Sequence, residues 1–217
     1  ILNGISLGSV YAIIALGYTK VYGIAKMLNF AHGDIIMVGS YVAFIAINSM
    51  GLPVPVSILL SVVVCTVLGM VIERVAYKPL RHASKLAVLI NAMLAVSEDD
   101  GAAQLMGINV NATIALTFAI GSGLAAIAGV LLCSAYPSLT PYTGSMPGIK
   151  AFVAAVFGGI GSIPGAFIGG ILLGVIEILG KAYISSQLAD AIVFAVLIVV
   201  LVVKPTGLLG KQIQEKV

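Results

Sequence analysis

Long apolar runs separated by short polar connections dominate this chain. The longer runs occupy residues 2–24, 27–48, 54–72, 114–132, 163–180 and 188–203. A membrane-spanning helix needs about 20 apolar residues, whereas the strands of a membrane barrel alternate in polarity over about 10 residues. Because these runs are continuous, we expect an all-α fold, a polytopic transmembrane helical bundle, with residues 1–217 forming a single domain.

Two further apolar stretches are short for membrane-spanning helices. Residues 86–96 would extend roughly 17 Å at about 1.5 Å per residue, against a hydrocarbon core of about 30 Å. We expect that this stretch lies on the membrane or that residues are missing beside it. Residues 148–160 are also short, but the count of crossings from the C-terminus requires that they cross. A re-entrant half-helix there would contradict this topology.

Composition agrees with a membrane protein, and charge indicates its orientation. The chain is 60% hydrophobic and 9% charged, against roughly 25% charged residues in soluble domains. Its net charge of +3 comes from Lys and Arg in the connections, which argues against a nucleic-acid partner. The strongest basic cluster is Arg74, Lys78, Arg81 and Lys85. The positive-inside rule places it in the cytoplasm, with the 20–26 turn and the C-terminus, and Arg74, Lys78 and Arg81 should meet lipid phosphates.

A polar insert at residues 29–34 interrupts the apolar sequence. It contains Asn29, His32, Gly33 and Asp34. An aspartate at membrane depth costs roughly 2.5 to 3.5 kcal/mol on insertion scales, so it should face a cavity, a partner or an interface. In one interpretation the helix is broken at Asn29 and Gly33, and the insert lines a translocation path. In the other, His32 and Asp34 cap a helix at the cytoplasmic interface, where the helix dipole favours Asp34. Both remain open.

The other polar residues within apolar runs favour structural roles. Glu177 and Lys181 have the i,i+4 spacing of an interfacial ion pair with a snorkelling Lys, and Asp190 is expected at a helix start. Cys65 and Cys133 lie in apolar runs without a ligand cluster, so we expect buried thiols and no metal site. The chain has no Walker A or HExxH motif, which predicts no catalytic residues.

Glycine recurs at helical spacing in the C-terminal third of the chain. The stripe consists of Gly161, Gly165, Gly169, Gly170 and Gly174. Small residues on one helix face allow backbones to approach closely, so these glycines predict a helix-packing surface. Packing within the chain is favoured over contact with a second subunit.

Residues 97–107 are acidic and Ala-rich, and they predict a short cytoplasmic helix. Ser97 can cap its start, carboxylates in the first turn suit the helix dipole, and Gly107 can end it. A small, partly apolar face on such a helix can dock into a groove of a partner. The residues expected to make this contact are Glu98, Asp99, Asp100, Ala102, Ala103, Leu105, Met106 and Gly107.

Seven segments together resemble a known family. They are residues 3–12, 17–23, 29–34, 95–109, 150–156, 158–166 and 204–208. On these motifs the chain is similar to the membrane permease subunits of bacterial ABC importers for branched-chain amino acids, and most closely to the permease of the high-affinity leucine, isoleucine and valine system. The similarity covers nearly the whole chain.

The resemblance implies a multi-pass permease of the bacterial inner membrane that binds no cofactor itself. It also implies a homologous second permease subunit, two cytoplasmic ATPase subunits that carry ATP and Mg, and a periplasmic amino-acid-binding protein. ABC importers insert a Glu-Ala-Ala motif, followed by three residues and Gly, into the ATPase. Here Ala102, Ala103 and Gly107 match that motif, and Gly101 replaces its Glu. Glu98 and the two aspartates after it lie one turn upstream and could substitute.

Family members are longer between the basic cluster and the acidic helix, where they carry further transmembrane helices. We therefore expect an internal deletion, or residues absent from the numbering, near residues 90–93. A related permease for sugars, urea or short amides remains an alternative, as does a passive channel or a scaffold subunit.

Overall fold

The computed structural model describes residues 1–25, 29–77, 110–136 and 139–210. The predicted acidic helix at 97–107, the short apolar stretch at 86–96 and the junction near 90–93 all lie outside this part of the chain. The all-α prediction is confirmed, because the described residues form helices joined by turns and short connections. The elements are α1 (Leu2–Ala25), α2 (His32–Asn48), α3 (Val54–Ile72), the π-helical turn η1 (Glu73–Tyr77), α7 (Val110–Ala135), α8 (Ser145–Gly158), α9 (Ile163–Tyr183) and α10 (Ala189–Val203).

The described helices fall into two length classes. Four of them, α1, α3 with η1, α7 and α9, are long and apolar enough to cross a membrane. The others, α2, α8 and α10, have 17, 14 and 15 residues. At about 1.5 Å per residue, α8 extends roughly 21 Å, less than the roughly 30 Å of a hydrocarbon core. The chain therefore combines full-length spans with half-length helices.

Local sequence explains where these helices begin. Pro53 precedes α3 in an extended conformation, and Pro55 follows in its first turn, where a missing N–H costs nothing. Ser162 caps α9, because its side-chain oxygen accepts a hydrogen bond from the Gly165 N–H at 3.2 Å. Pro164 again lies in the first turn.

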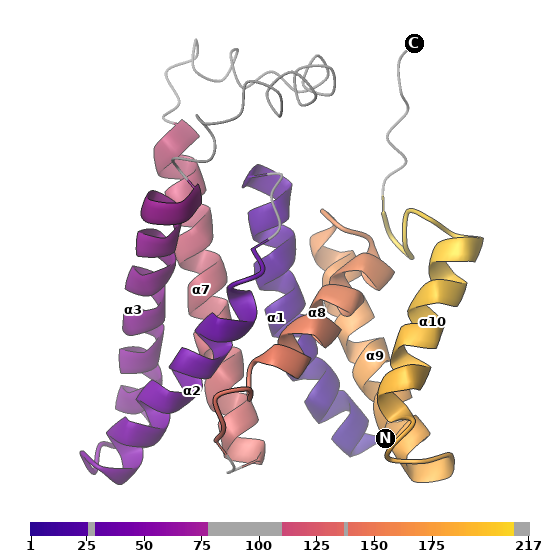
Figure 1. Ribbon diagram of the computed structural model, residues 1–217, viewed down its shortest axis with the longest axis horizontal. Helices are drawn as coiled ribbons and strands as arrows, with labels where there is room; N and C mark the ends of the chain where they lie inside the picture. The colour runs from indigo at the N-terminus through magenta and orange to yellow at the C-terminus, as the bar shows by residue number, and fades with distance from the viewer. Residues whose placement is uncertain (26–28, 78–109, 137–138, 211–217) are drawn as a thin grey trace.

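The helices are arranged as two units of opposite direction. In Figure 1, α1 and α3 run from the lower to the upper end of the bundle, whereas α7 and α9 run downward. α1 packs along α9 as α3 packs along α7, while α2 lies on α3 and α7 as α8 lies on α9 and α1. Exchanging α1, α2 and α3 with α7, α8 and α9 reproduces these contacts. The fold is therefore an inverted repeat, the architecture of many transporters, with α1 and α7 in contact at its centre.

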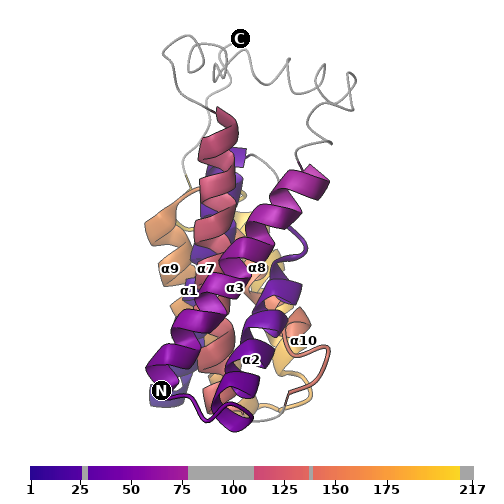
Figure 2. The same cartoon turned by 90° about the vertical axis from the view of Figure 1, so that its left-hand side faces the viewer.

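Figure 2, turned by a quarter, shows how α2 and α3 cross the bundle beside α7. Serine hydroxyls bind backbone carbonyls across these contacts: Ser40 donates to the Gly129 carbonyl and Ser61 to the Gly39 carbonyl, both at 2.8 Å. Within an apolar solvent such bonds add to packing in holding helices together. The α2, α3 and α7 group is thus joined by both small residues and hydroxyls.

The glycine stripe packs within the chain, on two different neighbours. A Cβ at Gly170 or Gly174 would overlap the backbone of α1 at Ala12 or Gly8, and a Cβ at Gly165 or Gly169 would overlap α8. Gly161 differs from the expectation. It lies in the turn before α9 with a φ of +91° and open space around it, so it serves the turn and not the packing.

The connection that leads out of α3 returns to the same end of the bundle. α3 with η1 ends at the upper end, and α7 begins there (Figure 1). The described ends of the chain on either side of residues 78–109 therefore lie at the same end of the bundle. The sequence also predicted a crossing at residues 148–160. There, residues 139–144 and α8 together run from the lower toward the upper end of the bundle (Figure 1).

Candidate functional site

The polar insert forms a turn followed by the start of a helix. α2 begins at His32 and not near residue 27, because the Asn29 side chain accepts the Ala31 N–H at 3.1 Å and the Asn29 carbonyl accepts the His32 N–H at 3.2 Å. Such local bonds replace those of a continuing helix. Gly33 lies inside α2, so the helix is not broken there, as one of the two open interpretations required, and Asp34 lies in the first turn.

The four residues of the insert point to different places. Asn29 and His32 are 2% and 1% exposed, whereas Asp34 is exposed. The His32 ring lies 4.4 Å from the ring of Tyr18, centroid to centroid, in a space that Gly17 leaves open. His32 therefore packs behind the start of α2 and caps nothing, while Gly33 and Asp34 face a cavity.

The starts of the two half-length helices meet inside the bundle. A Cβ at Gly144 would overlap the Gly33 carbonyl, and a Cβ at Gly148 would lie 3.0 Å from the Gly33 Cα. Only glycine permits this approach of α8 to α2. Two helix N-termini, each the positive end of a helix dipole, are thereby brought to one place.

A cavity of about 400 Å³ opens at this junction. It is lined by Tyr18, Phe30, Gly33, Asp34, Ser145, Gly148, Ile149 and Phe152. Among these described lining residues, Asp34 carries the only charge, and the first turn of α8 contains no acidic residue. An uncompensated helix N-terminus favours negative charge, and a carboxylate favours positive charge. The cavity thus offers one site for each sign beside aromatic and aliphatic walls.

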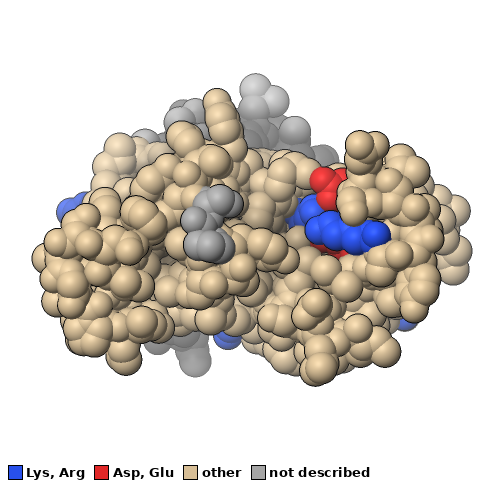
Figure 3. All heavy atoms as spheres, turned by 90° about the horizontal axis from the view of Figure 1, so that it is seen from below, with Lys and Arg blue, Asp and Glu red and all other residues tan. Residues whose placement is uncertain are grey.

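A second polar cluster, which the sequence did not predict as a whole, joins four helices near the lower end. The Lys150 ammonium lies 2.8 Å from Glu177 Oε1 and 2.7 Å from Asp190 Oδ1. Lys181 lies 2.6 Å from the same Glu177 oxygen, and the Tyr11 hydroxyl donates to Glu177 Oε2 at 2.8 Å. Figure 3 shows basic and acidic groups together in a hollow of the lower face.

The sequence found two parts of this ion network and missed its centre. The i,i+4 pair of Glu177 and Lys181 and the place of Asp190 in the first turn of α10 are as expected. The expected pair was interfacial, however, and Glu177 is 1% exposed. Lys150 received no prediction, although a lysine inside an apolar run needs a partner or a cavity. That rule was the available signal.

The described residues contain no group of three or more His, Cys, Asp or Glu side chains placed to hold a metal ion. Cys65 is buried, with its thiol 3.6 Å from the Ile35 carbonyl, and Cys133 is half-buried; both are free.

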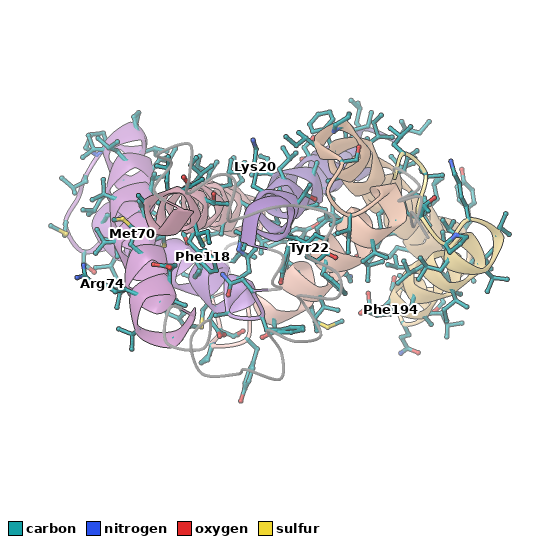
Figure 4. The ribbon with its side chains drawn as sticks, turned by 90° about the horizontal axis from the view of Figure 1, so that it is seen from above. Lys20, Tyr22, Met70, Arg74, Phe118 and Phe194 are labelled. Atoms are coloured by element: carbon teal, nitrogen blue, oxygen red, sulfur yellow. The ribbon has the colours of Figure 1, made fainter. Side chains whose placement is uncertain are left out.

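The described basic residues outside the ion network lie at the upper end. Lys20 and Arg74, seen from above in Figure 4, point away from the bundle near the upper ends of α1 and α3, and Lys204 follows α10 at that end. The lysines of the lower end, Lys150 and Lys181, are paired with carboxylates. The positive-inside rule assigns the upper end to the cytoplasm.

Comparison with known proteins agrees with this architecture. The family model of the branched-chain amino acid transport system permease component matches residues 1–96 and 91–201. The chain belongs to this family. The permease is therefore a multi-pass membrane component of a bacterial transport system, without catalysis of its own.

Individual relatives match over almost the whole permease. It is 40% identical to the high-affinity branched-chain amino acid permease LivH of Escherichia coli K12 over 295 residues, covering 99% of this chain and 96% of LivH. It is 39% identical to BraD of Pseudomonas aeruginosa over 297 residues, covering 100% and 97%. The autoinducer 2 permease LsrD of Salmonella paratyphi B is 31% identical over 183 residues, 81% of this chain and 51% of LsrD. No solved structure matches the chain.

Proposed function

We propose that the permease carries branched-chain amino acids through the cavity between α2 and α8, with Gly33 and Asp34 at its surface and Asn29 and His32 supporting them. The observation that carries this proposal is the meeting of two half-length helix starts around a cavity of about 400 Å³. In transporters built from inverted repeats, solutes bind where discontinuous helices end. The names of LivH and BraD support the solute class.

The chemistry of the cavity matches a zwitterion with an apolar side chain. The Asp34 carboxylate would pair with the solute ammonium, and the positive N-terminal end of the α8 dipole would attract its carboxylate. Phe30, Ile149 and Phe152 provide the apolar wall for a branched side chain. A neutral solute without these charges would leave Asp34 unpaired.

Substitution of Asp34 tests this assignment. Asp34→Asn should raise the KM for leucine uptake about 10-fold or more, since a hydrogen bond to a charged group contributes about 1.5–3 kcal/mol. Asp34→Glu, which keeps the charge, should raise it less. Asn48→Ala, at the exposed far end of α2, is the matched control and should leave KM unchanged.

A leucine analogue without its amino group identifies the group that Asp34 binds. In the parent permease the analogue should compete for uptake much less well than leucine. In Asp34→Asn the two should compete about equally, because the partner of the ammonium is gone. If Asp34→Asn keeps the full preference for leucine, the ammonium binds elsewhere and this site is wrong.

We further propose that ATP drives the cycle through partner subunits that dock at residues 97–107. The contact would be made by Glu98, Asp99, Asp100, Ala102, Ala103, Leu105, Met106 and Gly107. Membership of the family supports two ATPases that bind ATP and Mg, a second permease subunit and a binding protein on the outer side. α3 and α7, which flank this segment, would pass the movement to the bundle.

A charged residue placed among the small residues of the 97–107 segment tests coupling to the ATPase subunits separately from insertion into the membrane. Ala103→Glu should abolish uptake and co-purification of the ATPase subunits while the permease still inserts, because a carboxylate cannot enter an apolar groove without a partner. Ala135→Glu, the same change on an exposed residue at the lower end of α7, should retain both. Normal uptake by Ala103→Glu would exclude this contact.

We also infer that the connection of residues 78–109 is shortened relative to the family. The match to LivH spans 295 positions, 78 more than the 217 residues of this chain, so at least that many positions have no counterpart here. The family model matches in two stretches that overlap at residues 91–96, which includes the junction expected from the sequence.

A further inference from the structure

We infer that Lys150 is a positioning residue for solute binding: through the ion network of Tyr11, Lys150, Glu177, Lys181 and Asp190, it holds the cavity-lining half of α8 in place. This inference rests on the proposed function of the cavity. It concerns a group that touches no solute, and it assigns the network a role in transport affinity.

The first turns of α8 have two faces with different surroundings. Ile149 and Phe152 face the cavity, whereas Lys150 faces α9 and α10. Successive residues of a helix are rotated by about 100°, so the direction of the Lys150 side chain determines the direction of Ile149. A restraint on Lys150 is therefore a restraint on the cavity wall.

The contacts of Lys150 fix α8 from two sides at once. Its ammonium is 7% exposed and lies within 2.8 Å of a carboxylate oxygen on α9 and within 2.7 Å of one on α10. Glu177 is held in turn by the Tyr11 hydroxyl of α1. Moving or rotating α8 would separate a buried charge from its partners, which is costly in a medium of low polarity. The network thus couples α8 to three other helices.

The close contacts at the start of α8 are of a different kind. Gly144 precedes the helix and has no side chain with which to cap it, and the nearest neighbours of a Cβ at Gly148 are backbone atoms of Gly33. Close backbone contact limits how near the two helices approach, but it does not prevent α8 from rotating or sliding. The directional bonds of Lys150 supply what those contacts lack.

The charge balance of the network allows the role to be tested without unfolding the protein. Two lysines face two carboxylates, so removing Lys150 and Glu177 together leaves Lys181 and Asp190, which are 36% and 43% exposed. Replacing a buried ion pair by neutral side chains is often neutral for stability. The double variant Lys150→Met/Glu177→Gln therefore removes the restraint and leaves no unpaired buried charge.

Leucine uptake by reconstituted transporter, measured as KM and maximal rate, is the test. The double variant should raise KM at least fivefold with less than a twofold change in maximal rate, and Asp190→Asn should raise KM by a smaller factor. Lys150→Arg, which keeps the positive charge, should have a KM near the parent value. Lys20→Gln is the control outside the network, because Lys20 points away from the bundle near the upper end of α1, and its KM should be unchanged.

An unchanged KM in both the double variant and Asp190→Asn would overturn the inference. If the double variant fails to insert, Asp190→Asn decides alone, since that side chain is partly exposed. If Asp34→Asn weakens leucine binding but the network variants do not, only the role of Lys150 falls. If Asp34→Asn has no effect either, the cavity itself is not the solute site.

Discussion

His32 occupies space that one particular glycine provides. A Cβ at Gly17 would lie 2.8 Å from two atoms of the His32 ring and 3.2 Å from the Gly121 carbonyl oxygen. Both neighbours are packed in the interior and cannot move far. Gly23, one and a half turns later on the same helix, has nothing within 4 Å of the corresponding position.

Gly17→Ala should therefore destabilise the permease, and Gly23→Ala should not. Overpacking of a filled interior costs about 1–3 kcal/mol, whereas alanine in an open helix position gains up to about 1 kcal/mol over glycine. Thermal unfolding of the purified protein in detergent measures both. Equal melting temperatures for the two variants would show that His32 repacks without cost.

At the residue scale, the sequence identified the candidate residues of the insert but did not predict the direction of their side chains. Asn29, His32, Gly33 and Asp34 form one insert in the chain, but the fold directs Asp34 and the Gly33 backbone to a cavity and buries the other two. Side-chain direction depends on where the helix begins, and that start was decided by the Asn29 bonds. Lys150 was missed because its partners come from two other helices.

Among the elements, α1 and α9 pack more closely than ordinary side chains allow. A Cβ at Gly174 would overlap the Gly8 backbone, and one at Gly8 would lie 2.6 Å from the Ile171 carbonyl oxygen. Such contacts add packing and weak hydrogen bonds, which are the main forces between helices in lipid. The two inverted units are joined along this line.

Gly174→Ala should separate α1 from α9 and lower the yield of folded permease and its melting temperature. Gly180→Ala on the same helix is the control, because the added methyl group first meets the tip of the Ile192 side chain, at 3.1 Å, and a side chain can move aside. Size-exclusion profiles and thermal unfolding in detergent distinguish the two. A parent-like Gly174→Ala would mean that the helices need no such contact.

Helix extents were readable from the sequence where the chain is uniformly apolar. The runs that predicted α3 and α9 match them within a few residues, and α7 is extended beyond its run. α2 and α8 were placed less well, since each begins inside the bundle at a point set by the approach of Gly33 to Gly144. A contact between residues more than a hundred positions apart leaves no periodic signal.

For the whole molecule, the positions of α3 and α7 constrain any longer version of the connection between them. Both meet the upper end, so a segment inserted between residues 90 and 93 must cross the membrane an even number of times if the fold is kept. Grafting the corresponding LivH segment there should leave a C-terminal reporter on the cytoplasmic side. A reporter exported to the outer side would contradict the arrangement of α7 to α10.

The sequence by itself determined that this permease lies in a membrane, that its fold is all-helical and to which family it belongs. Apolar runs too long for a soluble core, charges placed mostly in the connections, and motifs spread along the chain are all local properties. Only the tertiary structure decided that two half-length helices meet, that Asp34 faces a cavity and that Lys150 bridges α8 to α9 and α10. These features depend on contacts between segments that are remote in the chain. The inverted repeat brings those segments together within the membrane, where glycine packs against the backbone of a neighbouring helix.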